Sequence, residues 1–406
     1  MLSPTSIAPY FVIMLLLLGV GAVLGRWVPF YHNLVRPNHG ARYETLDGLR
    51  GFLALGVFFS HGVTHYFYLR ERLWTPSSRF YALLGNVAVL FFFFITGFLF
   101  WMKAINGNGR VAPIALYKAR FRRLAPMYFC STLLVIAIAA CLMHFHLYSS
   151  LRNLVEESIR ACSLGLLGFR SFNGVGTRPI NGAVTWTLRY EWLFYLALPA
   201  IAFLARPVRF GFLVSALIVW RVAANWLPHL SPFVSGVFLQ FVGGMLAAHI
   251  VHHLPPPARP PRWLSIVPVT CLICIMAGFK GQYLFSVIAF LCFVYGDDLF
   301  GLLTAPGAKV LGAISYSIYL LHPIVLYLVL HTLNRFLPVG ALSGDLYWLL
   351  VAACGILLVL LSALTYRFVE HPFLGPSRAA KKKPDQSPST GRHTPLASET
   401  TSRWSA

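Results

Sequence analysis

Long apolar segments recur along the whole chain and decide the environment in which it can fold. A helix that crosses the hydrocarbon core of a bilayer needs about 20 mostly apolar residues, and many segments approach or exceed that length. Of the 406 residues, 57% are hydrophobic and only 11% are charged, whereas a soluble domain carries roughly a quarter charged residues. The sequence therefore predicts an all-α, polytopic bundle of transmembrane helices.

The apolar segments predict about eleven spanning helices, one of them ahead of a core of about ten. The segment 150–182, between two spans, can hold a re-entrant or interfacial element. Near its end the chain becomes rich in Pro, Ser, Thr and Lys, which is typical of a disordered tail. We expect an N-terminal helix and cytoplasmic linker (1–45), a membrane domain (46–374) and a cytoplasmic tail (375–406). The predicted spans are 8–27, 47–67, 81–102, 124–145, 184–204, 210–227, 233–251, 263–279, 283–300, 310–332 and 346–367.

The distribution of Lys and Arg among the loops predicts the orientation, because short cytoplasmic loops retain positive charge during insertion. One set of alternate loops is clearly richer in these residues, and we place it inside. The N-terminus is then outside and the C-terminus is cytoplasmic, and we expect the membrane to be the inner membrane of a bacterium. The basic residues of the richer set are Arg26, Arg36, Arg42, Lys103, Arg110, Lys118, Arg120, Arg122, Arg123, Arg206, Arg209, Arg259, Arg262, Lys309 and Lys381–Lys383.

Charge and cysteine content argue against two other functions. The formal net charge of +21 could indicate nucleic-acid binding, but the basic residues lie in membrane loops without a soluble domain to present them. We expect them to contact anionic lipid headgroups instead. Cys271 and Cys274 form a C-x-x-C pair inside a predicted span, where cysteine packs as a small hydrophobe. We predict no metal site and no nucleic-acid partner.

Ionisable side chains inside a membrane are costly, so each is a candidate functional residue. The span 47–67 holds Asp47, Arg50 and His61. At ~100° and ~1.5 Å per residue, the path from Arg50 to His61 is about three turns plus 20° and rises about 16 Å. The two side chains therefore share one face, with His61 about half a bilayer deeper than Arg50. Asp47, one turn before Arg50, is expected to pair with it.

This geometry suits an acyl-coenzyme A donor, whose anionic head would lie at Arg50 and whose thioester would reach His61. His61 could then act as a general base toward an acceptor hydroxyl near neutral pH, or be acylated itself and pass the group outward. A neutral histidine that is simply hydrogen-bonded in the bundle is the alternative. The aligned Arg50 and Asp47 favour the catalytic interpretation.

A basic stretch, Lys118–Tyr128, lies on the predicted cytoplasmic side. Pro126 suits the first turn of a helix, which would place the arginines at or just before a helix N-terminus, where anions are favoured. The guanidinium fork suits phosphate oxygens, and Arg120 and Arg123 can face one ligand. A basic loop that only sets topology is the alternative, but its location on the same side as Arg50 favours a phosphate clamp. The predicted donor-binding residues are Lys118, Arg120, Arg122, Arg123 and Tyr128.

The span 184–204 supplies candidates for binding the acceptor. Trp186, Glu191 and Tyr195 are expected near its outer end, where Glu191 and Tyr195 share a face. Carboxylate and aromatic side chains are suitable partners for sugar hydroxyls. An aromatic belt at the membrane interface would explain the tryptophan equally well.

The span 310–332 carries further supporting residues, Tyr316 and His322. His322 should lie near the depth of His61, so the two histidines could share a cavity. A kink at Pro323 that opens the bundle is the alternative explanation for this pair of residues.

These groups, in this order, resemble the acyltransferase-3 family of integral-membrane O-acyltransferases. The most specific feature is an arginine, a ten-residue gap and a histidine, followed by an arginine pair that leads into R-L-x-P-x-Y. The resemblance runs from about residue 46 to 374. The matching stretches are LDGLRGFLALGVFFSH (46–61), VAVLFFFFITGFLF (87–100), ALYKARFRRLAPMY (115–128), TWTLRYEWLFYLALP (185–199), LGAISYSIYLLHP (311–323) and YRFVEHPF (366–373).

The resemblance implies acyl-coenzyme A as co-substrate, without a permanently bound cofactor. It also implies transfer of an acyl group, acetyl by default, to a hydroxyl of an extracytoplasmic glycan or glycolipid such as O-antigen or exopolysaccharide. It assigns the functional arginine and histidine to Arg50 and His61, and the loop arginines to Arg120 and Arg123. Some members carry an appended soluble domain, which the short tail here cannot contain. We therefore expect the chain to finish the transfer itself or to hand over to a separate extracytoplasmic partner.

A transporter or flippase for a glycan or small anion is the main alternative, because a helix bundle with buried Arg, His and Glu also suits transport. A non-catalytic membrane scaffold is a third possibility. Transporter sites usually need broken helices and inverted repeats, and the sequence shows neither. The arginine cluster combined with a deep histidine favours the acyltransferase.

Overall fold

The computed structural model describes residues 2–35, 43–206, 209, 211, 236–257 and 260–374. The chain divides into Met1–Phe373 and Leu374–Ala406, and every element given below belongs to the first unit. Several sequence predictions lie outside the described residues. They are nearly all of the span 210–227, the start of the span 233–251, the tail 375–406 and the basic residues Arg36, Arg42, Arg259 and Lys381–Lys383.

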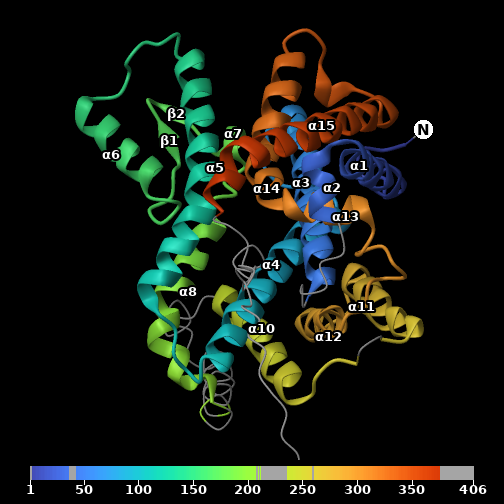
Figure 1. Ribbon diagram of the computed structural model, residues 1–406. Helices are drawn as coiled ribbons and strands as arrows, with labels where there is room; N and C mark the ends of the chain where they lie inside the picture. The colour runs from blue at the N-terminus through green and yellow to red at the C-terminus, as the bar shows by residue number, and fades with distance from the viewer. Residues whose placement is uncertain are drawn as a thin grey trace, which may run out of the picture. The chain divides into compact units, whose positions relative to one another are not determined.

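Helices make up almost all of the described structure (Figure 1). The first part of the chain contains α1 (Ala8–Trp27), α2 (Pro29–Val35), α3 (Glu44–Glu71), α4 (Arg79–Asn106), α5 (Pro113–Leu142), α6 (Leu151–Cys162), α7 (Arg178–Asn181) and α8 (Trp186–Ile201). The second part contains α10 (Gly236–His253), α11 (Ile266–Ala277), α12 (Gln282–Val294), α13 (Pro306–Ala313), α14 (Ser315–Leu326) and α15 (Gly344–Thr365). The π-helical turns Tyr327–His331 and Tyr366–Glu370 continue α14 and α15.

The predicted membrane bundle is confirmed. Within the described ranges, five helices are long and apolar enough to cross a membrane, namely α1, α4, α5, α8 and α15 with their extensions. The bent pair α13 and α14 gives a sixth span if it is counted as one. Shorter apolar helices at α10, α11 and α12 match the remaining predicted spans of this part of the chain. α3 is as long as α4, but its histidines and charged residues make it less apolar.

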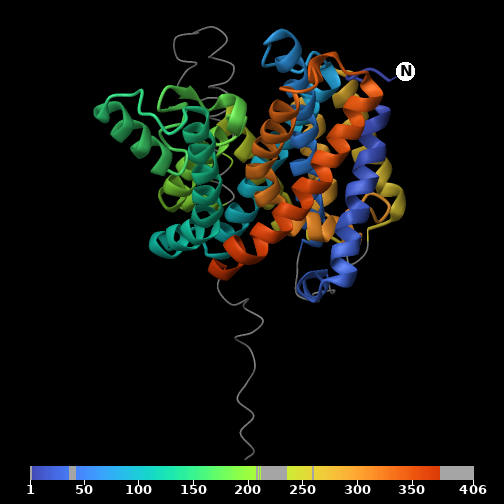
Figure 2. The ribbon, with the colours of Figure 1, turned by 90° about the horizontal axis from the view of Figure 1, so that it is seen from above.

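α3 is the central element of the bundle because it packs against α4, α13 and α14. α1 lies against α13 and α15, and Figure 2 shows α1 and α15 running side by side. Glycines permit the closest of these approaches. A Cβ added at Gly312 of α13 would lie only 1.8 Å from the carbonyl oxygen of Asp47, and one at Gly48 only 1.8 Å from that of Leu303. Small residues at such crossings let membrane helices pack backbone to backbone.

The segment 150–182 forms several short elements. It contains α6, the antiparallel pair β1 (Ser171–Phe172) and β2 (Val175–Gly176), and α7. The amide of Asn173, at the turn between the strands, donates to the carbonyl oxygen of His146. Figure 1 shows α6 and both strands beside the end of α5. The segment is therefore a small structured unit that follows α5 and leads into α8.

The predicted helix start at Pro126 is wrong. α5 begins at Pro113, which occupies its first turn, and Pro126 lies inside the helix. A proline inside a helix removes one backbone hydrogen bond, a defect that membrane helices tolerate where neighbouring groups compensate. Arg120 and Arg123 therefore project from the side of a continuous helix and not from its N-terminus.

The sequence analysis found no broken helix, and this prediction is also wrong. α13 and α14 are bent by 74° relative to each other at Ile314. As a result α14 starts in the interior of the bundle at Ser315, which is 1% exposed. The break therefore brings a helix N-terminus to membrane depth.

The close approach at Gly312 gives a direct test of this packing. Gly312→Ala should lower the melting temperature of the detergent-solubilised protein by several degrees, because overpacking a tight contact costs about 1–3 kcal/mol. Gly19→Ala is the matched control, since a Cβ there meets no atom within 4 Å. Equal melting temperatures for the two variants would contradict the described packing of α13 on α3.

Candidate active site

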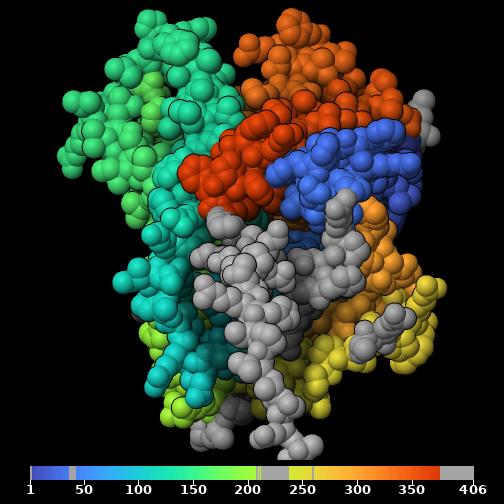
Figure 3. All heavy atoms as spheres, viewed as in Figure 1, coloured from blue at the N-terminus to red at the C-terminus, as the bar shows by residue number. Residues whose placement is uncertain are grey.

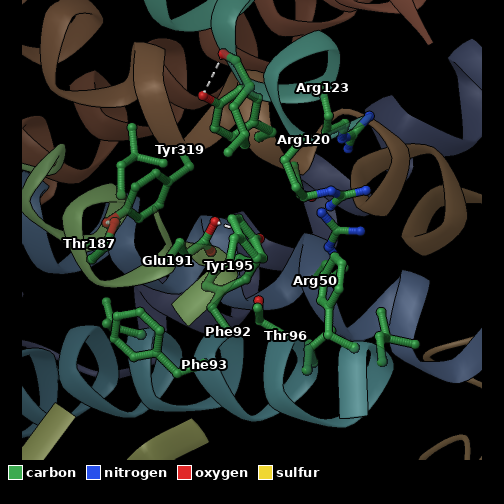
Figure 4. Close-up of a pocket in the computed structure, with 18 residues that line it drawn as sticks. Arg50, Phe92, Phe93, Thr96, Arg120, Arg123, Thr187, Glu191, Tyr195 and Tyr319 are labelled. Carbon is green, nitrogen blue, oxygen red and sulfur yellow. Dashed lines mark hydrogen bonds between the residues drawn. The ribbon is translucent and has the colours of Figure 1, made fainter. Parts of the chain in front are cut away.

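A pocket lies among α3, α4, α5, α8 and α14, and it gathers many of the predicted site residues. Figure 4 shows Arg50, Arg120 and Arg123 on one side of it, across from Thr187 and Tyr319. Aromatic and apolar side chains of α4 form much of the remaining wall. The lining includes Arg50, Phe92, Phe93, Thr96, Phe100, Arg120, Arg123, Leu124, Thr187, Leu188, Glu191, Tyr195, Ser315, Tyr316 and Tyr319.

Arg123 is held by an ion pair that the sequence analysis missed. Its guanidinium lies 2.5 Å from a carboxylate oxygen of Glu370, a residue with no exposed surface. The hydroxyl of Ser317 donates to the other carboxylate oxygen at 3.0 Å. Glu370 ends the π-helical turn Tyr366–Glu370, which packs against α5, and Figure 3 shows red atoms of this part of the chain against α5. The only sequence signal for Glu370 was an acidic residue within the stretch 366–373.

Arg120 is surrounded by aromatic rings. Its guanidinium carbon lies 4.8 Å from the ring centre of Phe100 and 5.8 Å from that of Tyr195, which are cation–π distances. Its Nε atom is buried and has no hydrogen-bond partner among the described residues. The ion pairs of these residues also include none that involves Arg50 or Arg120. The pocket therefore offers two cations without a carboxylate partner within 4.0 Å.

Glu191 and Tyr195 occupy the same pocket as the arginines. Tyr195 donates a hydrogen bond to Glu191 at 3.1 Å. The packing of α8 on α5 places them there, a proximity to Arg120 that the sequence analysis did not predict. Their role in acceptor binding stays a prediction.

His61 and His322 are brought into contact. The Nε2 atom of His322 lies 3.3 Å from the Nδ1 atom of His61. Each Nδ1 atom also faces the carbonyl oxygen four residues earlier, on Val57 at 3.1 Å and on Ile318 at 3.2 Å. A proton on each Nδ1 satisfies all three contacts. The Nδ1–H of His322 donates to Ile318, and the Nδ1–H of His61 is shared between Val57 and the Nε2 atom of His322. With this assignment the lone pair of His61 is on Nε2, which lies beside Gly182.

Tyr319 stands between the pocket and the histidine pair. It lines the pocket, and its ring centre lies 6.0 Å from that of His322. Its hydroxyl is 3.1 Å from that of Thr187 and donates to the carbonyl oxygen of Val184 at 3.0 Å. The pocket and the two histidines are thus neighbours across one ordered side chain.

Other predicted site residues lie outside the pocket. Asp47 is exposed, and the described residues show no ion pair between it and Arg50 within 4.0 Å, although the two charges interact at longer range. Lys118 and Arg122 point away on the exposed side of α5.

Two aromatic candidates also lie elsewhere. The hydroxyl of Tyr128 donates to the carbonyl oxygen of Ala161 and accepts from the backbone N–H of Gly165. This residue therefore ties α5 to the segment after α6. Trp186 is 45% exposed and does not line the pocket.

Comparison with known proteins agrees with this arrangement. The family described as an acyltransferase domain matches residues 43–367, from the start of α3 to the end of α15. The exopolysaccharide production protein ExoZ of Rhizobium meliloti (strain 1021) is 26% identical over 266 residues, which cover 61% of this chain and 78% of that protein. No solved structure matches. The chain is therefore a member of the acyltransferase-3 family, an integral-membrane acyltransferase.

Proposed function

We propose that this protein is an acyl-coenzyme A-dependent O-acyltransferase of a bacterial inner membrane, with its N-terminus outside and its C-terminus in the cytoplasm. It moves a short acyl group, acetyl in the simplest case, to a hydroxyl of an extracytoplasmic glycan. An exopolysaccharide is the preferred acceptor, because the relative ExoZ is named for exopolysaccharide production.

The observation that carries the proposal is a pocket in which Arg50 and Arg120 have no ion pair within 4.0 Å among the described residues, and which Tyr319 separates from His61 and His322. Unpaired arginines at membrane depth are costly unless an anion binds there. Their planar guanidinium groups suit the phosphates of coenzyme A. The N-terminus of α14 at Ser315 adds a partial positive charge, since Ser315 lines the same pocket. The aromatic wall beyond the arginines suits the uncharged arm of the donor.

The histidine pair supplies the chemistry. His61 Nε2 removes the proton of the acceptor hydroxyl while that oxygen attacks the thioester carbonyl carbon. The C–S bond then breaks, and the leaving thiolate takes the proton from His61 and departs as coenzyme A thiol. His322 accepts from the Nδ1–H of His61 and so stabilises the imidazolium that forms between these steps.

A transport function has one observation in its favour. The 74° break between α13 and α14 puts a helix N-terminus at membrane depth, as in the discontinuous helices of many transporters. The same feature serves a donor site equally well. The family match and the histidine pair favour the acyltransferase.

Removal of one pocket arginine tests the donor site. Arg120→Ala should raise the dissociation constant for coenzyme A by about 10- to 100-fold, because hydrogen bonds to charged groups contribute about 1.5–3 kcal/mol. The measurement is calorimetric titration of the protein in lipid nanodiscs. Arg122→Ala is the matched control, since Arg122 lies on the exposed side of the same helix, and its constant should stay within about threefold of wild type. Equal weakening by both substitutions would contradict a specific pocket.

His61→Gln tests the chemical step. It should lower the rate of acyl transfer by about 10²- to 10⁴-fold, the usual contribution of a general base, while coenzyme A still binds. The rate is followed by mass spectrometry of the glycan acyl groups in cells that lack the native gene and carry each variant. His252→Gln, at an exposed histidine of α10, should leave the rate unchanged.

The purified protein in lipid nanodiscs distinguishes two routes for the acyl group. Incubation with acetyl-coenzyme A and no acceptor should leave His61 unmodified if it acts as a base. An acetyl adduct on His61 would instead show that the histidine is acylated and passes the group on. A normal transfer rate in His61→Gln would exclude both routes.

A further inference from the structure

A second group of histidines and aromatic residues lies beyond His61, outside the arginine pocket. His65 follows His61 by one helical turn on the same side of α3. Its ring centre lies 5.1 Å from that of Trp74 and 5.7 Å from that of His331. His331 belongs to the π-helical turn that continues α14. α3 and the extension of α14, two segments whose earlier residues line the arginine pocket, are thus in contact again at this second group.

The nitrogens of this group are buried without hydrogen bonds. Both ring nitrogens of His65 and the Nε2 atom of His331 have no partner among the described residues. His65 has no exposed surface, so its nitrogens face other side chains. A buried polar group without a partner destabilises the folded state, and such groups often mark a ligand or a catalytic role. A ligand that brings hydroxyl groups would satisfy these nitrogens, because a hydroxyl both donates and accepts.

Aromatic side chains surround these nitrogens, and the guanidinium groups of Arg72 and Arg178 lie against two of the rings. The ring of Tyr68 lies 5.2 Å from that of Trp74 and 5.9 Å from that of His331. Tyr327 stacks on His331 with ring centres 4.2 Å apart. The guanidinium of Arg178, at the start of α7, lies 5.8 Å from the ring centre of Trp74. Large rings with polar edges suit a ligand that has an apolar face and a polar rim.

The segment around α7 connects this group to His61. Arg178 contacts Trp74 at one end of the segment, and Gly182 follows its other end. Gly182 has a φ of +59°, and a Cβ there would lie 3.2 Å from the Nε2 atom of His61. The segment therefore contacts the ring of Trp74 at one end and lies beside His61 Nε2 at the other.

We propose that the outer histidine group, consisting of His65, Tyr68, Trp74, Arg178, Tyr327 and His331, binds the acceptor as a sugar. The tryptophan and tyrosine rings stack on the C–H face of the sugar, and His65 and His331 bond its hydroxyls. One hydroxyl then reaches His61 Nε2 along the Gly182 segment. This assignment rests on the proposed function. If the donor enters at the Arg50 end of α3, the acceptor enters at the opposite end, where this group lies.

A binding experiment tests this site without relying on turnover. The probe is a set of oligosaccharides released from the exopolysaccharide of the cells that carry this gene and freed of esters with mild base. Binding to the protein in lipid nanodiscs is measured by microscale thermophoresis, with coenzyme A titrated in parallel. We expect Trp74→Ala and His65→Gln each to weaken oligosaccharide binding by tenfold or more, while coenzyme A binds as in wild type. Trp74→Phe keeps a ring and should weaken oligosaccharide binding less. Trp263→Ala is the control, at an exposed tryptophan outside this group.

Two results would overturn the proposal. One is normal oligosaccharide binding by Trp74→Ala and His65→Gln, and the other is the absence of oligosaccharide binding by a wild-type protein that binds coenzyme A. The second result leaves the donor half of the proposed function intact. Oligosaccharide binding without coenzyme A binding would instead refute the proposed donor and support the outer site.

Discussion

The ion pair between Arg123 and Glu370 is the interaction on which the pocket depends. It joins α5 to the end of α15, two segments far apart in the sequence, at a place where Glu370 has no exposed surface. Removal of one partner of a buried pair leaves an uncompensated charge, which typically costs about 3–5 kcal/mol. The pair therefore fixes one arginine and the position of α5, so that Arg120 faces the same space without a carboxylate partner. Arg120 is held there against the rings of Phe100 and Tyr195.

Two neighbouring helices each carry a row of functional groups. Along α3 come Arg50, then His61 and then His65, and along α14 come Tyr316, Tyr319 and His322, with His331 in its π-helical extension. Side chains three or four residues apart share a helix face, so each helix presents its groups as one row. The rows meet at the contact between His61 and His322. The arginine pocket, the histidine contact and the outer histidine group thus follow one another along these two helices.

The sequence predicted the parts of this structure that depend on composition and helical periodicity. Hydropathy located the described spans, and the spacing of Arg50 and His61 indicated one face of one helix. It could not predict Glu370 as the partner of Arg123, because no periodicity relates residues on helices so far apart. Pro126 suggested a helix start, but the favourable stretch from Pro113 continues the helix through it. The sequence also did not show that Glu191 shares a pocket with the arginines, because this follows from the packing of α8 on α5.

The central claim is that coenzyme A binds with its phosphates at Arg50 and Arg120 and its acyl end beside His61. Cryo-electron microscopy of the protein in nanodiscs with a non-hydrolysable thioether analogue of acetyl-coenzyme A tests it most directly. The account predicts phosphate density against these two arginines and the acyl end next to His61 Nε2. Density for the analogue at any other place, with the arginine pocket empty, would contradict it.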